Sequence, residues 1–452
     1  MVTVHIRFHE ETRRQGIGYL YSADIFFMPD TAQWIEHIMT RKEKELLFVN
    51  GSRLLRTFDE LGQIGATSHG GVTRLSLSDD EVEAKTYIIE LMRRAGLEVH
   101  VDPVANVIGV LNGTLNTELV ACGSHVDTVI DGGRYDGSYG VLASIEALRS
   151  IKESEIKLSH PLAAIAFTNE EGVRFPTMVG SRYAARLVTL RDVRALRGSD
   201  GVTFEEALIK SKLELESDSF LAKYKPGTYV ELHIEQGPIL ENERKQIGVV
   251  ENIVGTMQVE LVIHGSASHA GTTPMAARRD ALLTASKIIQ FVNNLSREIG
   301  RGFVGTVGYL EVIPNAPNVI PGEVKLIIDF RNNSIEVIEL ASSKINEMTK
   351  DVANKEGVQI DNRQRAYLPP TRMTGSILNL IERVTDDLEL TWHRMQSGAG
   401  HDAMIMRRIA DTGMIFVPSK HGKSHSPAEE TAPDDLIHGA NVLINTLGRL
   451  SE

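Results

Sequence analysis

Four segments of the sequence combine residue types that bind metal ions or transfer protons. The first contains His125, Asp127 and, after a glycine-rich stretch, Asp136. A histidine with an aspartate two residues later offers an imidazole ligand and a carboxylate able to hold its other ring nitrogen. The glycines would let the loop return Asp136 to His125, although Gly and Asp are also the ordinary residues of a surface turn.

The other three segments add acids and histidines. Glu170 and Glu171 follow an apolar run, and because adjacent side chains point in different directions, one can ligate a metal while the other acts as a general base. His233 stands inside an apolar strand, where a single histidine is more often a core residue. The segments 398–402 and 424–429 contribute further histidines. Together the segments offer three histidines, an aspartate able to bridge and a glutamate. These are five ligands of the kind that suits Zn²⁺ or Mn²⁺, the number that two metals sharing one carboxylate require.

The elements that must position these residues alternate between strands and helices. A capping box at Ser78–Glu81 precedes an apolar stripe that ends at Gly96, which predicts a helix. We predict further helices at 139–151, 376–387 and 433–450, and strands at 97–101, 107–111, 119–122, 162–167, 229–234 and 413–417. This alternation favours an α/β layer structure with a mostly parallel sheet, whose strand ends are the usual place for a site.

The pattern changes between residues 255 and 362. Strands at 257–264, 303–312, 324–330 and 358–360 and helices at 280–299 and 334–354 give the order β-α-β-β-α-β of a ferredoxin-like unit. We therefore expect a discontinuous catalytic domain, 47–254 with 363–452, interrupted by an inserted domain at 255–362. Residues 1–46 show weak periodicity and form an N-terminal extension of unknown role.

The composition excludes several classes of protein. The 452 residues carry a formal net charge of −12 and no long cluster of Lys or Arg, so no nucleic-acid partner is expected. Cys122 is the only cysteine, which rules out an intramolecular disulfide. No apolar run approaches the ~20 residues that cross a bilayer, so no membrane partner is expected. We expect a folded, cytoplasmic protein.

From about residue 51 onwards the sequence resembles the metal-dependent amidohydrolases of the M20 peptidase clan, in particular the branch of N-carbamoyl-L-amino-acid hydrolases, allantoate amidohydrolases and β-ureidopropionases. The resemblance rests on ordered motifs: GSHVDT at 123–128, NEEGVRF at 169–175, ELHIEQGP at 231–238, SHAGTTP at 268–274, PNVIP at 317–321 and SGAGHD at 397–402. It implies an α/β fold in two domains: a mixed-sheet metallohydrolase domain with an inserted ferredoxin-like α+β dimerisation or lid domain.

The resemblance also implies a role for each metal ligand. His125 and His233 would hold one divalent ion, Zn²⁺, Mn²⁺ or Co²⁺, and Glu171 and His425 would hold a second. Asp136 would bridge the two ions of each subunit. Asp127 would orient His125, and Glu170 would act as general base and then general acid on the water between the metals.

A small carboxylate substrate is the expected partner. By the same resemblance Arg331 would grip its carboxylate, Gln236 and Asn318 would hydrogen-bond the ureido or carboxylate end, and His269 would donate to the developing oxyanion. Without the resemblance, Arg331 is equally well explained as an ordinary charged residue at the end of a strand, and Asn318 as a residue that favours a turn. His401 and Asp402 are interpreted as residues that shape their loop.

The expected function is hydrolysis of the carbamoyl C–N bond of N-carbamoyl-L-amino acids, giving the L-amino acid, ammonia and CO₂. Allantoate amidohydrolase and β-ureidopropionase are the alternatives within the branch, and a catalytically silent relative that binds a carboxylate is the non-enzyme alternative. His233 stands where the peptidases of the clan usually carry a carboxylate, which favours an amidohydrolase. We also expect a homodimer, formed through the inserted domain, in which His269 completes the site of the neighbouring subunit.

Overall fold

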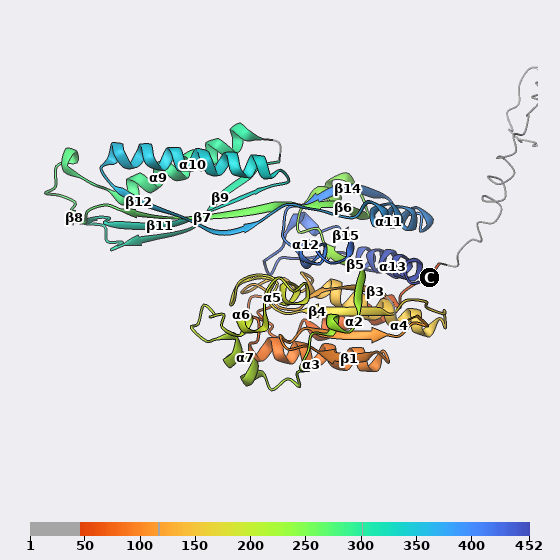
Figure 1. Cartoon of the computed structure of the whole chain (residues 1–452). Coiled ribbons are helices and arrows are strands. Elements are labelled where there is room, and N and C mark those ends of the chain that lie inside the picture. Colours follow the sequence, from red (N-terminus) through yellow and green to blue (C-terminus); the bar gives the residue numbers. More distant parts are fainter. Residues whose placement is uncertain (1–45, 116–117, 301) are drawn as a thin grey trace, which may run out of the picture. The chain divides into compact units, whose positions relative to one another are not determined.

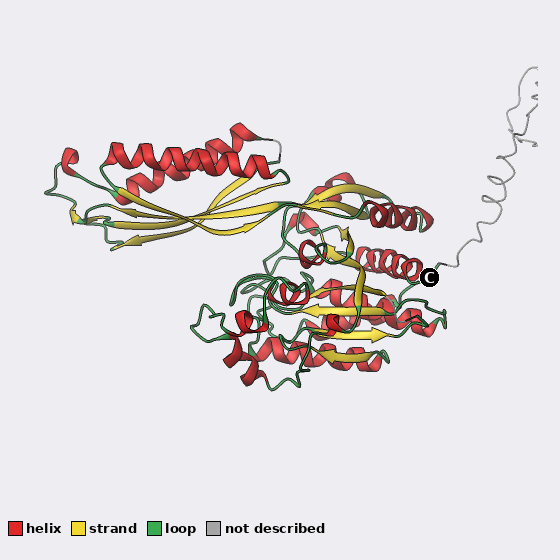
Figure 2. Ribbon diagram, in the orientation of Figure 1, coloured by secondary structure: helices red, strands yellow, loops and turns green. Residues whose placement is uncertain are grey.

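The computed structural model describes residues 46–115, 118–300 and 302–452, so residues 1–45 of the expected N-terminal extension lie outside the described residues. Two larger β-sheets organise the described part, one of nine strands and one of four, beside a small two-stranded sheet. Figure 1 traces the chain through these sheets, and Figure 2 shows the helices that accompany them. In this part of the chain no helix is long and apolar enough to span a membrane.

The nine-stranded sheet draws its strands from both sides of the four-stranded one in sequence. Its strand order is β1-β2-β4-β3-β5-β15-β6-β13, and β14 also pairs with β6. The strands are β1 (Glu98–Val101), β2 (Val107–Leu111), β3 (Glu118–His125), β4 (Leu162–Phe167), β5 (Lys225–Ile234), β6 (Ile247–Ile253), β13 (Thr371–Arg372), β14 (Trp392–Ser397) and β15 (Asp411–Val417).

The expectation of a mostly parallel sheet is wrong. Strands β3, β4, β5 and β15 are parallel to their neighbours within this group, and β14 is parallel to β6. The pairs β1–β2, β2–β4, β6–β15 and β6–β13 are antiparallel. The sheet is therefore mixed, as the family resemblance implied, because apolar periodicity identifies a strand but carries no information about its direction.

Four longer helices pack on this sheet, and all four were predicted: α3 (Asp79–Arg94), α4 (Ser138–Glu153), α11 (Gly375–Asp387) and α13 (Pro433–Leu450). A further helix, α2 (Gly51–Leu61), packs against α4 and α13. Ser78 caps α3 as predicted, since its side chain accepts the N–H of Glu81 at 3.3 Å. The other half of the capping box does not form. The Glu81 carboxylate accepts the N–H of Leu77 at 3.0 Å and pairs with Lys85 at 2.9 Å, with both charged side chains fully buried.

Shorter helices fill the connections between the strands. They are α5 (Val179–Ala184), α6 (Leu190–Arg194), α7 (Phe204–Ser211), α8 (Ile239–Glu243), α12 (Asp402–Met406) and the 3₁₀ turns η1 (Phe220–Ala222), η2 (Met275–Ala277) and η3 (Lys420–Gly422). None of these short elements was predicted, nor were α2, β6 and β14.

The four-stranded sheet has the order β12-β7-β11-β9 and is antiparallel throughout. With helices α9 (Ala281–Ile299) and α10 (Ile335–Glu356) along one face, this is the predicted ferredoxin-like arrangement (Figure 1). Its strands are β7 (Gly255–His264), β9 (Val304–Ile313), β11 (Glu323–Asn332) and β12 (Gln359–Leu368). Strand β12 continues past residue 362, where we had expected the segment to end.

The four-stranded sheet has a hydrophobic core of its own. Alternate residues of β11, namely Val324, Leu326, Ile328 and Phe330, are fully buried and pack in one cluster with the apolar face of α9 and α10. A separate cluster contains the strands and helices of the nine-stranded sheet. The period of two along β11 and the stripe along each helix explain why these segments were recognisable in the sequence.

Candidate metal centre

Parallel strands bring the predicted metal ligands to one edge of the nine-stranded sheet. His125 is the last residue of β3, Glu170 and Glu171 follow the end of β4, and His233 lies near the end of β5. Asp136 stands two residues before α4, and His425 lies in the loop after β15. Because β3, β4, β5 and β15 are parallel neighbours, their carboxyl ends meet at this edge.

Asp136 lies between two groups of ligands. Its Oδ1 is 3.2 Å from His233 Nε2 and 3.6 Å from His125 Nε2. Its Oδ2 is 3.4 Å from His425 Nε2, which is also 3.4 Å from Glu171 Oε2. Within each group, His125–Asp136–His233 and Asp136–Glu171–His425, the candidate ligand atoms lie within 4.8 Å of one another. The two groups share Asp136, so one carboxylate oxygen faces each of them.

Backbone carbonyls orient two of the imidazoles. Nδ1 of His125 lies 2.9 Å from the carbonyl oxygen of Asp127, and Nδ1 of His233 lies 2.9 Å from that of Ile234. A proton on Nδ1 donated to these carbonyls leaves Nε2 as the ligand atom on both rings.

Asp127 therefore orients His125 through its main-chain carbonyl. The carboxylate of Asp127 has a different role, which the sequence analysis did not predict. Asp127 Oδ1 is 3.8 Å from His125 Nδ1. Instead the two carboxylate oxygens accept the N–H groups of Glu170 at 3.1 Å and Glu171 at 3.2 Å. The side chain thus holds the turn that carries both glutamates.

Gly137 allows the chain just before α4 to pass close to the imidazoles of His125 and His233. Gly137 has a φ of +63°, and a Cβ there would lie 2.4 Å from the ring of His125. Its N–H donates to His233 Nε2 at 3.0 Å. A side chain at this position would displace one of the two imidazoles.

The site holds more buried carboxylate than the surrounding cations can balance. Among the described residues, none of its acids has an ion pair with Lys or Arg: Asp127, Asp136, Glu170, Glu171, Glu231, Asp402 and Glu429. Burial, followed by repulsion from Asp402, raises the pKa of Glu170 well above its usual range. Burial and the charge of Asp136 raise the pKa of Glu171 to about 8.

The histidines respond to the same charges. Burial lowers the pKa of His125 to about 4. Burial also lowers the pKa of His233, but the hydrogen bond to Asp136 and the charges of Asp136 and Glu231 together outweigh it, and the pKa rises to about 9. The hydrogen bond to Asp136 likewise raises the pKa of His425 to about 9. Three imidazoles and two carboxylates around uncompensated negative charge are a donor set that fits divalent cations such as Zn²⁺ or Mn²⁺.

Gln236, a predicted substrate-binding residue, lies at this centre. Its Nε2 donates to Asp136 Oδ2 at 2.6 Å. Its Oε1 is buried, and no donor in the described part of the chain reaches it. The side chain therefore presents an unused acceptor beside the shared carboxylate.

Arg331 joins the end of β11 to the motif at 397–402. Its Nε donates to Asp329 Oδ1 at 2.8 Å, and its Nη1 donates to the carbonyl of Gly398 at 2.9 Å. Gly398 lies three residues before His401, whose ring packs at 4.6 Å against that of His233. The interpretation of His401 as a loop-shaping residue omitted this ring contact.

His269 and Asn318 are placed together but are not joined to the metal ligands. His269 lies on β8 (Ser268–His269), which pairs with β10 (Val319–Ile320), and the carbonyl of Asn318 accepts the N–H of Ala270 at 3.0 Å. Both side chains are exposed. Over the described ranges, neither residue has a hydrogen bond or ion pair with the five ligand candidates.

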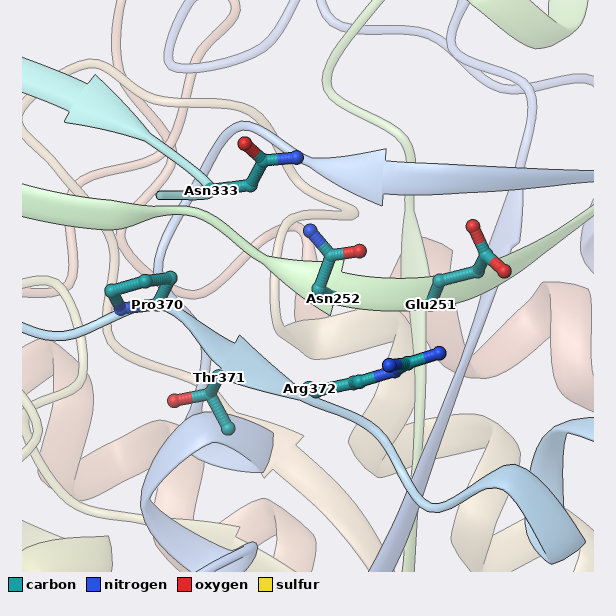
Figure 3. A pocket seen from close by; sticks show the side chains of 6 residues that line it. All are labelled: Glu251, Asn252, Asn333, Pro370, Thr371 and Arg372. Atoms are coloured by element: carbon teal, nitrogen blue, oxygen red, sulfur yellow. The ribbon is translucent and has the colours of Figure 1, made fainter. Parts of the chain in front are cut away.

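A cavity of about 250 Å³ lies where the chain passes between the two larger sheets (Figure 3). Its polar lining comes from the end of β6, from β13 and from the residue after β11: Glu251, Asn252, Asn333, Pro370, Thr371 and Arg372. No predicted site residue lines it, so it is separate from the candidate metal centre.

Ser424 and Glu429 lie at the centre, but the sequence analysis did not predict them as site residues. Ser424 Oγ lies 2.8 Å from Asp136 Oδ2 and 2.7 Å from Glu429 Oε2. The segment 424–429 had been noted for His425, and the presence of a glutamate four residues later was the available signal.

Comparison with known proteins connects this geometry to a family. The family model for peptidase family M20/M25/M40 matches residues 121–449. An N-carbamoyl-L-amino-acid amidohydrolase of Paenarthrobacter aurescens is 38% identical over 403 residues, covering 88% of this chain and 97% of that protein. An allantoate amidohydrolase of Bacillus subtilis is 34% identical and covers 90% of this chain and 100% of that protein.

A solved structure agrees in fold. The crystal structure of an amidase of the hydantoinase/carbamoylase family from Burkholderia vietnamiensis superposes with a TM-score of 0.83 at 36% identity, covering 89% of this chain and 98% of that one. With the sequence relatives and the converging metal-ligand set, this agreement establishes that the chain belongs to peptidase family M20/M25/M40.

Proposed function

We propose that this amidohydrolase cleaves the carbamoyl C–N bond of N-carbamoyl-L-amino acids with the help of two divalent metal ions. The observation that carries the proposal is the position of Asp136, whose two oxygens face two separate groups of imidazole and carboxylate ligands. The name of the Paenarthrobacter aurescens relative, 38% identical over 88% of this chain, supports the choice of substrate.

His125, Asp136 and His233 would hold one ion, and Asp136, Glu171 and His425 would hold the other. Divalent ions bound there would supply Lewis acidity, which lowers the pKa of water and polarises a carbonyl. The carbonyl oxygens of Asp127 and Ile234 keep the Nε2 atoms of His125 and His233 directed at the centre.

Glu170 is the proposed proton carrier. Its Oε2 lies 3.7 Å from His125 Nε2, beside the ligands but outside both groups, so it is free to exchange a proton. Glu170 takes a proton from the attacking water, whose oxygen forms a bond to the carbamoyl carbon. As the C–N bond breaks, Glu170 returns the proton to the departing nitrogen.

Gln236 and Arg331 are proposed to select the substrate. The unpartnered Oε1 of Gln236 can accept an N–H of a ureido group, which a carbamoyl substrate supplies. Arg331 uses Nε and Nη1 for Asp329 and Gly398, and the remaining donors of its guanidinium are available for a carboxylate. Asn318 is proposed to bind the same end of the substrate.

The segment 255–362 is proposed to dimerise, so that the partner subunit's His269 donates to the developing oxyanion. The supporting observation is that His269 and Asn318 are exposed and have no bond to the metal ligands of their own chain within the described ranges. A site completed by the neighbouring subunit accounts for two functional side chains that their own centre leaves unused.

Ammonia release tests the proposed reaction. The metal-loaded enzyme is incubated in parallel with N-carbamoyl-L-methionine, N-carbamoyl-β-alanine and allantoate, with Glu170→Gln as the inactive control. We expect the largest kcat/KM for the N-carbamoyl-L-amino acid. No ammonia from any of the three compounds would reject the function, and a preference for another compound would reject the substrate.

Allantoate is the second candidate substrate. The 34% identity to the Bacillus subtilis allantoate amidohydrolase extends over 90% of this chain, nearly the same coverage as for the carbamoyl-amino-acid relatives. The two substrates share a ureido group and a carboxylate, so the same residues would bind either one.

A further inference from the structure

We propose that Glu429 is a positioning residue that ties the loop of Asp136 to the loop of His425 and so sets the metal affinity of the centre. This inference rests on the proposed metal site. Glu429 takes no part in the proposed reaction and belongs to neither ligand group. It is nevertheless a buried acid, with 6% of its surface exposed.

The Glu429 carboxylate holds the main chain at Asp136. Its Oε1 accepts the N–H of Tyr135 at 2.8 Å and the N–H of Asp136 itself at 3.1 Å. Glu429 and Asp136 are 293 residues apart in the sequence, so this bond joins two otherwise distant segments. Charge-assisted bonds from backbone N–H groups are the kind that fix a loop most firmly.

The second oxygen reaches the carboxylate of Asp136 through Ser424. Glu429 Oε2 is 2.7 Å from Ser424 Oγ, which lies 2.8 Å from Asp136 Oδ2. Ser424 is the residue directly before His425. Glu429 thus contacts the main chain of Asp136 directly and the side chain of Asp136 through Ser424. Glu429 and Ser424 both lie in the segment that supplies His425.

The glycine at position 133 shows how closely the first loop wraps around this carboxylate. A Cβ on Gly133 would lie 1.9 Å from Glu429 Cδ, closer than any real contact. A side chain there must push the carboxylate away. Gly133 and Glu429 therefore provide two independent ways to break the same arrangement.

Of the two ligands in the loops that Glu429 joins, His425 is the less enclosed. Half of its side chain is exposed, and its φ of +52° is a backbone conformation that non-glycine residues rarely adopt. The imidazoles of β3 and β5 are enclosed by the sheet, whereas His425 lies in a loop. Loss of an outer hydrogen-bond partner typically weakens metal binding about 10- to 100-fold, and we expect the second ion to account for the loss.

The test compares four variants by metal affinity, measured by competition with a chromophoric chelator for Zn²⁺, and by the melting temperature of the metal-free protein. Glu429→Ala removes the anchor, and Gly133→Ala displaces it. Glu429→Gln retains an oxygen for the two N–H groups and is the conservative rescue. Glu146→Ala is the control for loss of a buried acid away from the site: Glu146 is 5% exposed, accepts the N–H of Asn50 and the hydroxyl of Ser150, both at 3.0 Å, and also pairs with Arg53 at 2.7 Å.

We expect Glu429→Ala and Gly133→Ala to weaken binding of one Zn²⁺ about 10- to 100-fold, with Glu429→Gln close to the wild type. Glu146→Ala should lower the melting temperature and leave the affinity unchanged. Unchanged affinity in folded Glu429→Ala, or an equal loss in Glu146→Ala, would overturn the inference; if Glu429→Ala does not fold, Gly133→Ala decides in the same way. A wild-type protein that binds no Zn²⁺ would instead reject the proposed metal site.

Discussion

The neighbouring acids Glu170 and Glu171 are expected to fail in different ways when each is changed to glutamine. Glu171 Oε2 lies 3.4 Å from His425 Nε2 and belongs to the second ligand group, whereas Glu170 belongs to neither group. Glutamine preserves the shape of each side chain and removes its charge. Each variant therefore serves as the steric control for the other.

The expected magnitudes follow from these positions. Without the Glu171 carboxylate, the second group retains only Asp136 and His425, while the first group is intact. Glu171→Gln should therefore bind about one ion per chain, against the two expected for the wild type. Glu170→Gln should keep both ions and lose about 10²- to 10⁴-fold in kcat, the usual contribution of a general acid–base group. That loss corresponds to about 3 to 5 kcal/mol of transition-state stabilisation.

Elemental analysis of the dialysed proteins gives the number of ions, and ammonia release gives kcat. The wild type and both variants are measured after loading with the same concentration of Mn²⁺ or Zn²⁺. If Glu170→Gln loses an ion and Glu171→Gln keeps both, the two roles are reversed. If Glu170→Gln keeps full activity, the reasoning that assigns it the proton transfer is wrong.

Four further results are expected. Chelation should abolish turnover and Mn²⁺, Co²⁺ or Zn²⁺ should restore it, so full activity in protein shown to be metal-free would exclude the dinuclear mechanism. Arg331→Lys should raise KM sharply for carboxylate substrates because an ammonium cannot reproduce the paired bonds of a guanidinium; an unchanged KM would remove Arg331 from the site. Equal amounts of Glu170→Ala and His269→Ala chains, refolded together, should recover about a quarter of wild-type activity. Half of the dimers are mixed, and each mixed dimer has one intact site of two. Mixed dimers without activity would contradict the shared site. Lys85→Met should lower the free energy of unfolding by about 3 to 5 kcal/mol, measured by urea denaturation, because it leaves the buried Glu81 without its cation; a smaller loss would mean that Glu81 is neutral in the folded protein.

Local signals in the sequence were sufficient for the elements whose stability is local. The helix capped by Ser78 appears where its cap and apolar stripe predicted it. The helix Ala281–Ile299 and the fully buried strand Leu162–Phe167 also appear where they were predicted. The β-α-β-β-α-β order was recognisable for the same reason, because each of its helices has one apolar stripe and β11 alternates. Residue types and order indicated the kinds of ligand, and the family resemblance identified the five residues that the structure brings together in two groups.

One of the missed strands, β14, lacks a local signal. Strand β14 (Trp392–Ser397) is largely polar, with exposed residues on one face, and it contains no apolar run. Its pairing with β6, and the antiparallel pairing of β6 with β15, arise from the assembly of the sheet. Direction and register are properties of a pair of strands, and a single segment of sequence does not contain them.

The sequence by itself determined which residues have the chemistry of a metal site, because ligand type is a property of the individual side chain. Only the tertiary structure decided how these residues are held. The carbonyl of Asp127 lies against His125 Nδ1, the carboxylate of Asp127 accepts the N–H of Glu170, and the carboxylate of Glu429 accepts the N–H of Asp136. Each of these contacts involves main-chain atoms, which every residue has, so they cannot be predicted from residue type. They also join segments up to 293 residues apart, whose meeting depends on the packing of the whole sheet.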